Sequence, residues 1–144
     1  MSSLTERDGK HGGRFHYVSP NTDLMAWVCE RATGLRYAEL LSERLWTPIG
    51  AEYSGYITLD RIGAARAAGG VCFTARDLAR VGLLIANNGC ANGKQIISEA
   101  WIDDIVNNGS YDAWKKREGM EEFGNMPMHY RSFWYVQKDG DPLV

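Results

Sequence analysis

The sequence predicts an α+β fold in which several helices precede the start of an antiparallel sheet. Four segments carry apolar residues at helical spacing, bounded by residues that are typical of helix ends. A later segment, YRSFWYVQ at residues 130–137, is rich in aromatic residues and is followed by a turn signal. We therefore expect a mainly helical region followed by the first strand of a returning sheet.

The first helix is predicted to begin at Ser19 or Asn21 and to run to about Thr33. Ser19 is expected to be its N-cap, with Pro20 in the first turn, and Gly34 is the expected C-terminal stop. Helical spacing predicts a shared buried face for three apolar residues of this segment, which are Leu24, Trp27 and Val28.

A second helix is predicted over residues 37–45, before a Pro and Gly stop signal. Residues 51–71 lack helical periodicity, and the segment 53–59 is expected to be a short strand or an extended loop. The adjacent Gly69 and Gly70 suggest tight backbone geometry or a close approach to another element.

The third helix is predicted to begin at a capping box formed by Thr74 and Asp77 and to end at residues 87–89. The Asn-Gly pair at 92–93 predicts a turn between two short extended pieces. Ser98 is expected to cap a fourth helix. The inward-facing residues expected on these two helices are Leu78, Val81, Ile85, Trp101, Ile102, Ile105 and Val106.

Residues 110–128 are polar and predict a long loop with one helical turn near Trp114. Residues 130–137 predict a single strand, and residues 138–141 predict a hairpin turn. Only residues 142–144 follow, which would leave the aromatic strand partly unpaired. This pattern favours the interpretation that the sequence is an internal piece of a longer chain.

Length and composition indicate one ordinary globular domain. The chain has 144 residues, of which 44% are hydrophobic and 24% charged, and its formal net charge is −2. This charge gives no reason to expect nucleic acid or an anionic membrane as a partner, and no apolar run suits a membrane span or signal peptide. Residues 1–13 are expected to be a flexible lead, and residues 14–144 the partial domain.

The cysteines and histidines argue against a metal site or a disulfide framework. Cys29, Cys72 and Cys90 are widely spaced and form no C-x-x-C motif, and the three histidines lack the spacing of metal ligands. Cys29 and Cys72 are expected to be small buried hydrophobic residues. We therefore expect no cofactor and a reducing compartment, the cytoplasm.

Tyr17 and Ser19 are the candidate catalytic pair. In an extended segment their side chains would point the same way, which would bring two hydroxyls together. A tyrosine acts as a base when a nearby cation lowers its pKa from about 10 toward neutrality. The alternative is structural, with Ser19 capping the helix and Tyr17 packing as an amphipathic aromatic. Gly69 and Gly70 are candidate substrate-binding residues, with a purely structural turn as their alternative.

Three stretches together resemble a known family. They are FHYVSPNTDLMAWVCERATGLRYAELLSERLWTPIGAE at 15–52, AAGGVCFTARDLARVGLLIANNG at 67–89 and NGKQIISEAWIDDIV at 92–106. They resemble the serine hydrolases of the beta-lactamase and penicillin-binding class, within it most closely the 6-aminohexanoate-dimer hydrolase and class C beta-lactamase-related group. The resemblance covers about residues 14–137 and implies the α/β sandwich of that class.

The resemblance implies roles for two residues. The family carries a Ser-x-x-Lys motif, a Tyr-x-Asn or Tyr-x-Ser motif and a Lys/His-x-Gly triad on a strand of the sheet. The second is assigned to Tyr17-Val18-Ser19, the first is absent from the sequence, and the third is expected beyond the hairpin turn. Tyr17 would shuttle a proton between the nucleophile and the leaving group, and Ser19 would support the hydrogen bonds around the substrate. Without a Ser-x-x-Lys motif the 144 residues are expected to be inactive alone.

The leading functional hypothesis is a serine hydrolase that cleaves small-molecule amides or esters through an acyl-enzyme. A beta-lactamase or DD-peptidase-like activity is the alternative among enzymes. A non-catalytic binding or structural module, or a plain helical interaction domain, is the alternative from another class. The sequence does not set the oligomeric state.

Overall fold

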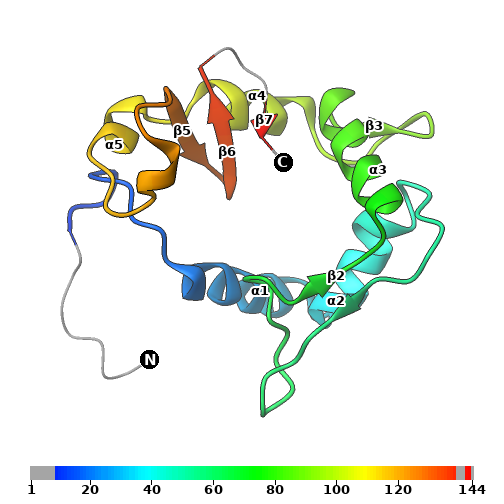
Figure 1. Cartoon of the computed structure of the whole chain (residues 1–144). Coiled ribbons are helices and arrows are strands. Elements are labelled where there is room, and N and C mark those ends of the chain that lie inside the picture. Colours follow the sequence, from blue (N-terminus) through cyan, green and yellow to red (C-terminus); the bar gives the residue numbers. More distant parts are fainter. Residues whose placement is uncertain (1–8, 139–141, 144) are drawn as a thin grey trace. The chain divides into compact units, whose positions relative to one another are not determined.

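The structure is a computed structural model that describes residues 9–138 and the strand at 142–143 (Figure 1). Its chain forms two compact units. One unit is Val18–Ile102, and the other combines Met1–Tyr17 with Asp103–Val144. The two units are described separately below.

Helix α1 (Ser19–Thr33) opens the unit Val18–Ile102 and has the predicted length. Its N-cap is Val18, whose backbone is extended, and no side chain caps this end, so the prediction of Ser19 as N-cap is wrong. Pro20 lies in the first turn as predicted. A proline is tolerated there because the backbone N–H that it lacks would have no partner within the helix. Gly34 ends the helix at φ +74°, as predicted.

The predicted buried face of α1 is wrong. Trp27 is 51% exposed and Val28 is 47% exposed, whereas Ala26 is the buried residue of this helix. Within its own unit α1 packs against the short helix α2 (Tyr37–Leu41), and no described element of that unit covers Trp27 and Val28. Helical spacing predicts which residues share a face but not which face finds a partner.

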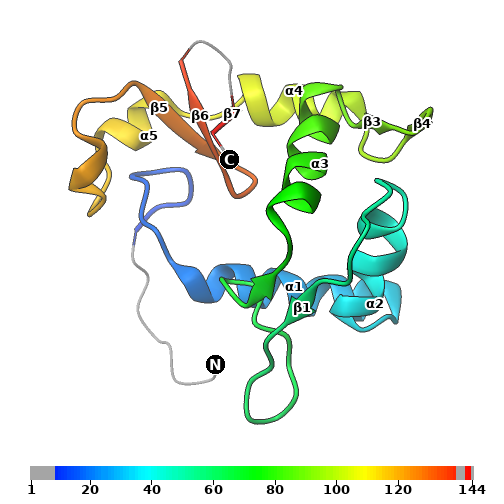
Figure 2. The same ribbon diagram turned by 45° about the vertical axis from the view of Figure 1, so that its right-hand side comes forward.

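Helix α2 continues without interruption into a π-helical turn, η1 (Ser42–Trp46), so the predicted helix at 37–45 is confirmed. It starts at Arg36, whose amide donates to the Glu39 carboxylate at 3.0 Å. After η1 the chain turns at residues 47–50 and then reaches strand β1 (Tyr56–Ile57). Strand β1 pairs antiparallel with β2 (Val71–Cys72), as Figure 2 shows, which confirms the extended segment predicted at 53–59.

Helix α3 (Ala75–Ala86) begins at the predicted cap, where the Thr74 hydroxyl accepts the Asp77 amide at 3.1 Å. The Asp77 carboxylate accepts from the Thr74 hydroxyl and from the amides of Glu52 and Tyr53, so the reciprocal half of the capping box is replaced by long-range contacts. Ile85 is buried as predicted, and Leu84 is buried with it. Of the other two predicted inward residues, Val81 is half-buried and Leu78 is exposed.

The predicted turn at 92–93 joins strands β3 (Cys90–Ala91) and β4 (Lys94–Gln95). Helix α4 (Glu99–Asn107) follows, and the Ser98 hydroxyl accepts the Trp101 amide at its start, as predicted. Ile102 and Ile105 are buried as expected, and Val106 is half-buried. Trp101 is exposed, so its predicted inward position is wrong.

The second unit contains the sheet. Helix α5 (Tyr111–Lys115) is the predicted helical turn near Trp114, and a 3-10 turn, η2 (Glu121–Phe123), follows it. Strands β5 (Met128–Arg131), β6 (Trp134–Gln137) and β7 (Pro142–Leu143) then form an antiparallel sheet in the order β5-β6-β7. The expected single strand at 130–137 is therefore wrong.

The segment 130–137 is part of a hairpin instead. Arg131 pairs with Trp134, and the two residues between them, Ser132 and Phe133, have φ of +50° and +70°. Such turns normally use Asn or Gly, so this sequence carries no turn signal at that point. Strand β7 pairs antiparallel with β6 and is the return strand that the sequence analysis did not expect. The turn predicted at 138–141 falls largely on residues 139–141, which lie outside the described residues.

The core of this second unit is aromatic. Trp114, Met128, His129 and Val136 are buried, and His129 Nε2 lies 2.9 Å from the Val106 carbonyl oxygen. The Arg131 guanidinium binds both carboxylate oxygens of Asp104 at 2.8 Å. These contacts hold strand β5 against the C-terminal part of α4.

The three cysteines are free. Cys29 and Cys90 are half-buried, but Cys72 is exposed, so the expectation that Cys72 is buried is wrong. Its strand pairs only with β1, so one face of this two-stranded sheet is open to solvent. None of the helices in the described part of the chain is long and apolar enough to cross a bilayer.

Candidate active site

Tyr17 lies at the end of an extended segment that is attached to an aromatic cluster. His16 forms a parallel bridge with Glu118, and the Phe15 amide donates to the Ala113 carbonyl at 3.0 Å. The Phe15 ring packs 4.8 Å from that of Tyr130. Because side chains alternate along an extended chain, Phe15 and Tyr17 share one side of the segment. Tyr17 itself is 45% exposed.

The phenols near Tyr17 are proton donors at neutral pH. Burial, and then the neighbouring Tyr135 and Tyr17, raise the pKa of Tyr130 to about 12. Burial, and then Tyr17 and Glu122, also raise the pKa of Tyr135 above its ordinary value. In the described part of this unit no lysine or arginine bonds to Tyr17. The cation that a tyrosine base requires is thus not among these contacts.

Ser19 does not share an extended face with Tyr17. The chain changes from extended at Val18 to helical at Ser19, so the alternation of side chains stops before Ser19. This corrects the geometric argument for the pair. Ser19 is half-buried, and its hydroxyl has no hydrogen-bond partner among the described residues. A catalytic or substrate-binding role for Ser19 stays a prediction.

Asp23 connects the start of α1 to the glycine pair, a contact that sequence reasoning missed. Its carboxylate accepts the Ala68 amide at 2.9 Å. Asp23 is four residues after Ser19, so the two side chains lie on the same face of α1. Gly69 and Gly70 follow Ala68 directly. The candidate residues Ser19, Gly69 and Gly70 are thereby tied to one end of α1.

The glycine pair makes a turn that other residues would not fit. Gly69 has φ +135°, and Gly70 is buried with its amide 2.8 Å from the Arg66 carbonyl. A Cβ atom on Gly70 would overlap the Arg66 carbonyl and the Thr58 hydroxyl. The tight geometry predicted for this pair is confirmed. Substrate binding by it stays a prediction.

Replacing Gly70 by alanine should lower the free energy of unfolding by about 1–3 kcal/mol, because the added methyl group collides with backbone on a fixed turn. Gly82 is the matched control, since it lies inside α3 and a Cβ there meets nothing within 4 Å. Gly82→Ala should raise stability by about 0.5–1 kcal/mol. Urea denaturation of both variants checks this, and a Gly70→Ala variant as stable as the parent would contradict the turn.

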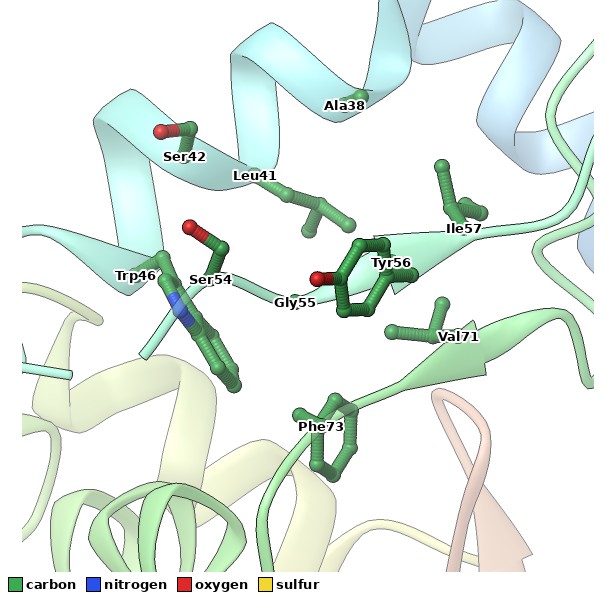
Figure 3. A pocket seen from close by; sticks show the side chains of 10 residues that line it. All are labelled: Ala38, Leu41, Ser42, Trp46, Ser54, Gly55, Tyr56, Ile57, Val71 and Phe73. Carbon is green, nitrogen blue, oxygen red and sulfur yellow. The ribbon is translucent and has the colours of Figure 1, made fainter. Parts of the chain in front are cut away.

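The same unit contains a small apolar cavity of about 220 Å³, which Gly69 and Gly70 do not line (Figure 3). Its walls come from α2, η1, β1 and β2, and Trp46 and Phe73 pack at its side with ring centroids 5.3 Å apart. The Trp46 indole N–H donates to the Tyr53 carbonyl at 2.7 Å. Three hydroxyl-bearing residues, Ser42, Ser54 and Tyr56, are among those that line it. No local sequence pattern predicts this cavity, because its walls come from separate segments of the chain.

Asp77 positions the segment that leads into the cavity. Its buried carboxylate accepts the Glu52 amide at 2.9 Å and the Tyr53 amide at 3.3 Å. Arg80 pairs with Asp77 at 2.8 Å and with the Glu52 carboxylate at 2.6 Å. The pKa of Asp77 lies below its ordinary value of 3.8, mainly because its carboxylate accepts the Glu52 amide. The hydrogen bonds from Thr74 and Tyr53 and the charge of Arg80 lower it further, whereas burial acts in the opposite direction.

This lowered pKa predicts an acid-sensitive fold. A carboxyl whose pKa is depressed by folding stabilises the native state above its unfolded pKa, about 3.9, and that contribution is lost as pH falls through the lower folded pKa. Asp77→Asn should therefore be less stable than the parent at pH about 7 and should lose less stability on acidification below about pH 4. Thermal midpoints across this range test it, with exposed Asp112→Asn as the control. Equal acid sensitivity of Asp77→Asn and the parent would contradict this role.

Comparison with known proteins identifies the family. The Beta-lactamase family model matches residues 4–141. The chain belongs to the beta-lactamase family. Among curated proteins, the 6-aminohexanoate-dimer hydrolase of Paenarthrobacter ureafaciens is 46% identical over 111 residues. That match covers 76% of this chain and 28% of the hydrolase.

A solved structure from Bacillus anthracis, titled "Putative 6-aminohexanoate-dimer hydrolase", is also similar to this chain. It matches with a TM-score of 0.79 and 31% identity over 94% of this chain and 34% of the other. The chain thus spans about a third of the length of these relatives. The expected α+β fold of the beta-lactamase type is confirmed, with helices and small antiparallel sheets.

The 144 residues contain Tyr-x-Ser twice, at Tyr17-Val18-Ser19 and Tyr130-Arg131-Ser132, but no Ser-x-x-Lys motif. No group of three or more His, Cys, Asp or Glu residues that could hold a metal occurs among the residues described. Tyr17 and Ser19 carry hydroxyls, and Tyr130 and Tyr135 carry phenols whose raised pKa keeps them neutral at neutral pH.

Proposed function

We propose that this chain is the tyrosine-bearing part of a serine hydrolase that cleaves small-molecule amides or esters. The reaction passes through an acyl-enzyme: a serine oxygen attacks the carbonyl carbon, the amine or alcohol leaves with a proton, and water then releases the acid. The nucleophilic serine and its lysine come from outside these 144 residues.

In this proposal Tyr17 carries the proton from the nucleophile to the leaving group. Its exposure leaves the hydroxyl accessible, and the neutral phenols of Tyr130 and Tyr135 supply donors beside it. The unpaired hydroxyl of Ser19 donates to or accepts from the substrate. Gly69 and Gly70 bring backbone close to the substrate without side chains in the way.

The observation that carries the proposal is the match to the Beta-lactamase family over residues 4–141, supported by 46% identity to a protein named 6-aminohexanoate-dimer hydrolase. We propose a cytoplasmic location, which the three free cysteines support because thiols stay reduced there.

A segment replacement tests the proposal. The matching segment of the Paenarthrobacter ureafaciens 6-aminohexanoate-dimer hydrolase is exchanged for this chain, and hydrolysis of the 6-aminohexanoate dimer, p-nitrophenyl acetate and nitrocefin is measured. The isolated 144-residue chain is assayed in parallel.

We expect the chimera to hydrolyse the amide or the ester faster than nitrocefin, and the isolated chain to hydrolyse none of them. A chimera that folds, by its circular dichroism spectrum and cooperative melting, but hydrolyses no substrate would contradict the proposal. Faster turnover of nitrocefin would instead favour the beta-lactamase alternative. Hydrolysis by the isolated chain, abolished by Tyr17→Phe, would refute the need for an external nucleophile.

A further inference from the structure

The unit that contains the sheet has a second, larger cavity of about 570 Å³, which lies within the size range of small-molecule sites. Its lining comes from α5, from the loop before β5 and from the residue after β6. The candidate residues Tyr17, Ser19, Gly69 and Gly70 do not line it. Its chemistry is therefore independent of the reaction proposed above.

Three cationic side chains line this cavity: Lys115, Arg117 and Lys138. None of its lining residues is acidic. Like charges gathered in one concavity raise the local potential, and a low-dielectric wall strengthens it. The cavity is therefore positively charged even though the whole chain has a net charge of −2.

Among the described residues these three charges form no strong ion pair. Arg117 donates to the carbonyl oxygens of Trp114 and Gly124, and within the described residues neither Arg117 nor Lys138 pairs with a carboxylate. Lys115 pairs only with Asp112, at 3.8 Å and with both side chains more than three-quarters exposed, which makes the pair weak.

Two of the three charged residues, Arg117 and Lys138, are held by contacts of their backbone or side chain. The Lys138 amide donates to the Pro127 carbonyl at 2.9 Å, which fixes the start of its side chain at the cavity rim. The Arg117 guanidinium lies 4.8 Å from the centroid of the Trp114 ring. A cation stacked on an aromatic ring and bonded to carbonyls keeps its position without a counter-charge.

The remaining walls are apolar. Trp114 and Met128 are buried, and Met126 and Pro127 continue the apolar surface. The Trp114 indole N–H is already bonded to the Met126 carbonyl at 3.1 Å, so the ring offers only its apolar surface. A ligand that satisfies both parts of the cavity has one anionic end and an apolar body.

We propose that this cavity binds a small organic carboxylate, with Lys115, Arg117 and Lys138 around the carboxylate group and Trp114, Met126 and Met128 against its carbon chain. Hexanoate is a suitable probe because it combines these two parts and nothing else. Hexan-1-ol keeps the apolar body without the charge, and inorganic phosphate keeps the charge without the body.

The experiment titrates the three probes into the ¹⁵N-labelled 144-residue chain and follows the indole N–H resonance of Trp114. The signal is assigned by triple-resonance spectra, so no tryptophan variant is required. The single variant is Lys138→Gln, and the double variant combines Lys115→Gln with Lys138→Gln. Lys116→Gln is the matched control, since Lys116 is exposed, follows α5 directly and does not line the cavity.

Hexanoate is expected to shift the Trp114 resonance saturably, and more tightly than hexan-1-ol or phosphate. Lys138→Gln should weaken hexanoate about two- to fivefold, and the double variant roughly tenfold, while Lys116→Gln stays within about twofold. Equal affinity for hexan-1-ol would mean a purely apolar site, and equal affinity for phosphate a purely charged one. Each of these two results would overturn the proposal. The absence of a saturable shift would overturn it too, and so would equal losses of hexanoate affinity in Lys116→Gln and Lys138→Gln.

Discussion

Replacing Trp114 by alanine should lower the free energy of unfolding by about 3–5 kcal/mol, the usual loss for a buried tryptophan. Trp114 is 2% exposed, and its ring contacts those of Phe15, Phe123 and Tyr135. The substitution removes these contacts and leaves the Met126 carbonyl without its donor. Urea denaturation followed by circular dichroism measures the loss.

Trp101→Ala is the matched control, because it removes the same side chain from a position that is 52% exposed on α4. Its loss should stay within about 0.5 kcal/mol, as for most surface changes. Similar losses for Trp101→Ala and Trp114→Ala would mean that the aromatic core around Trp114 does not form as described.

Replacing Tyr17 by phenylalanine in the chimeric hydrolase should lower kcat/KM about 10²- to 10⁴-fold, the contribution of a positioned proton-transfer group. The substitution removes the hydroxyl and keeps the ring, so the contacts of Phe15 and Tyr130 nearby are preserved. Steady-state kinetics on the 6-aminohexanoate dimer measure the effect.

Tyr53→Phe is the control for this change, because Tyr53 is 60% exposed and only its backbone forms hydrogen bonds among the described contacts. Its kcat/KM and thermal midpoint should match those of the parent chimera. A Tyr17→Phe variant with unchanged kcat/KM would remove Tyr17 from the mechanism. A loss of activity that only parallels a fall in thermal midpoint would make Tyr17 structural.

The helices could be predicted because their ends carry local chemical signals. Thr74 caps α3, Ser98 begins α4 and Gly34 ends α1, and each of these depends on neighbours within a few residues. Ser19 shows the limit of such signals. A serine before a proline suits a cap, but the helix begins at Ser19 itself, and its N-cap is Val18, which carries no capping side chain.

The hairpin at 128–137 could not be predicted from local signals. Its turn uses Ser132 and Phe133 at positive φ, where residues such as Asn and Gly are normal. The pairing of Met128 with Gln137 and of Arg131 with Trp134 holds these two residues there. Tertiary pairing overrides the local preference, so a sequence pattern reads the segment as one strand.

The candidate site was predictable only in part, for the same reason. The Tyr-x-Ser motif at Tyr17 is visible in the sequence, and the adjacent Gly69 and Gly70 predict a tight turn. The Asp23 contact with Ala68 spans 45 residues, and the cavity beside Trp46 draws on walls from three separate segments. Contacts between distant residues leave no spacing in one sequence, and so they required the structure.

The proposal that this chain supplies the catalytic tyrosine of a serine hydrolase is tested most directly by the acylation burst of the chimera. Rapid mixing with p-nitrophenyl acetate should release a burst of p-nitrophenol close to one equivalent of enzyme, followed by slower turnover. Tyr17→Phe should slow the burst by about 10²-fold or more, with the thermal midpoint unchanged. A burst of equal rate in the parent chimera and in Tyr17→Phe would contradict the assignment.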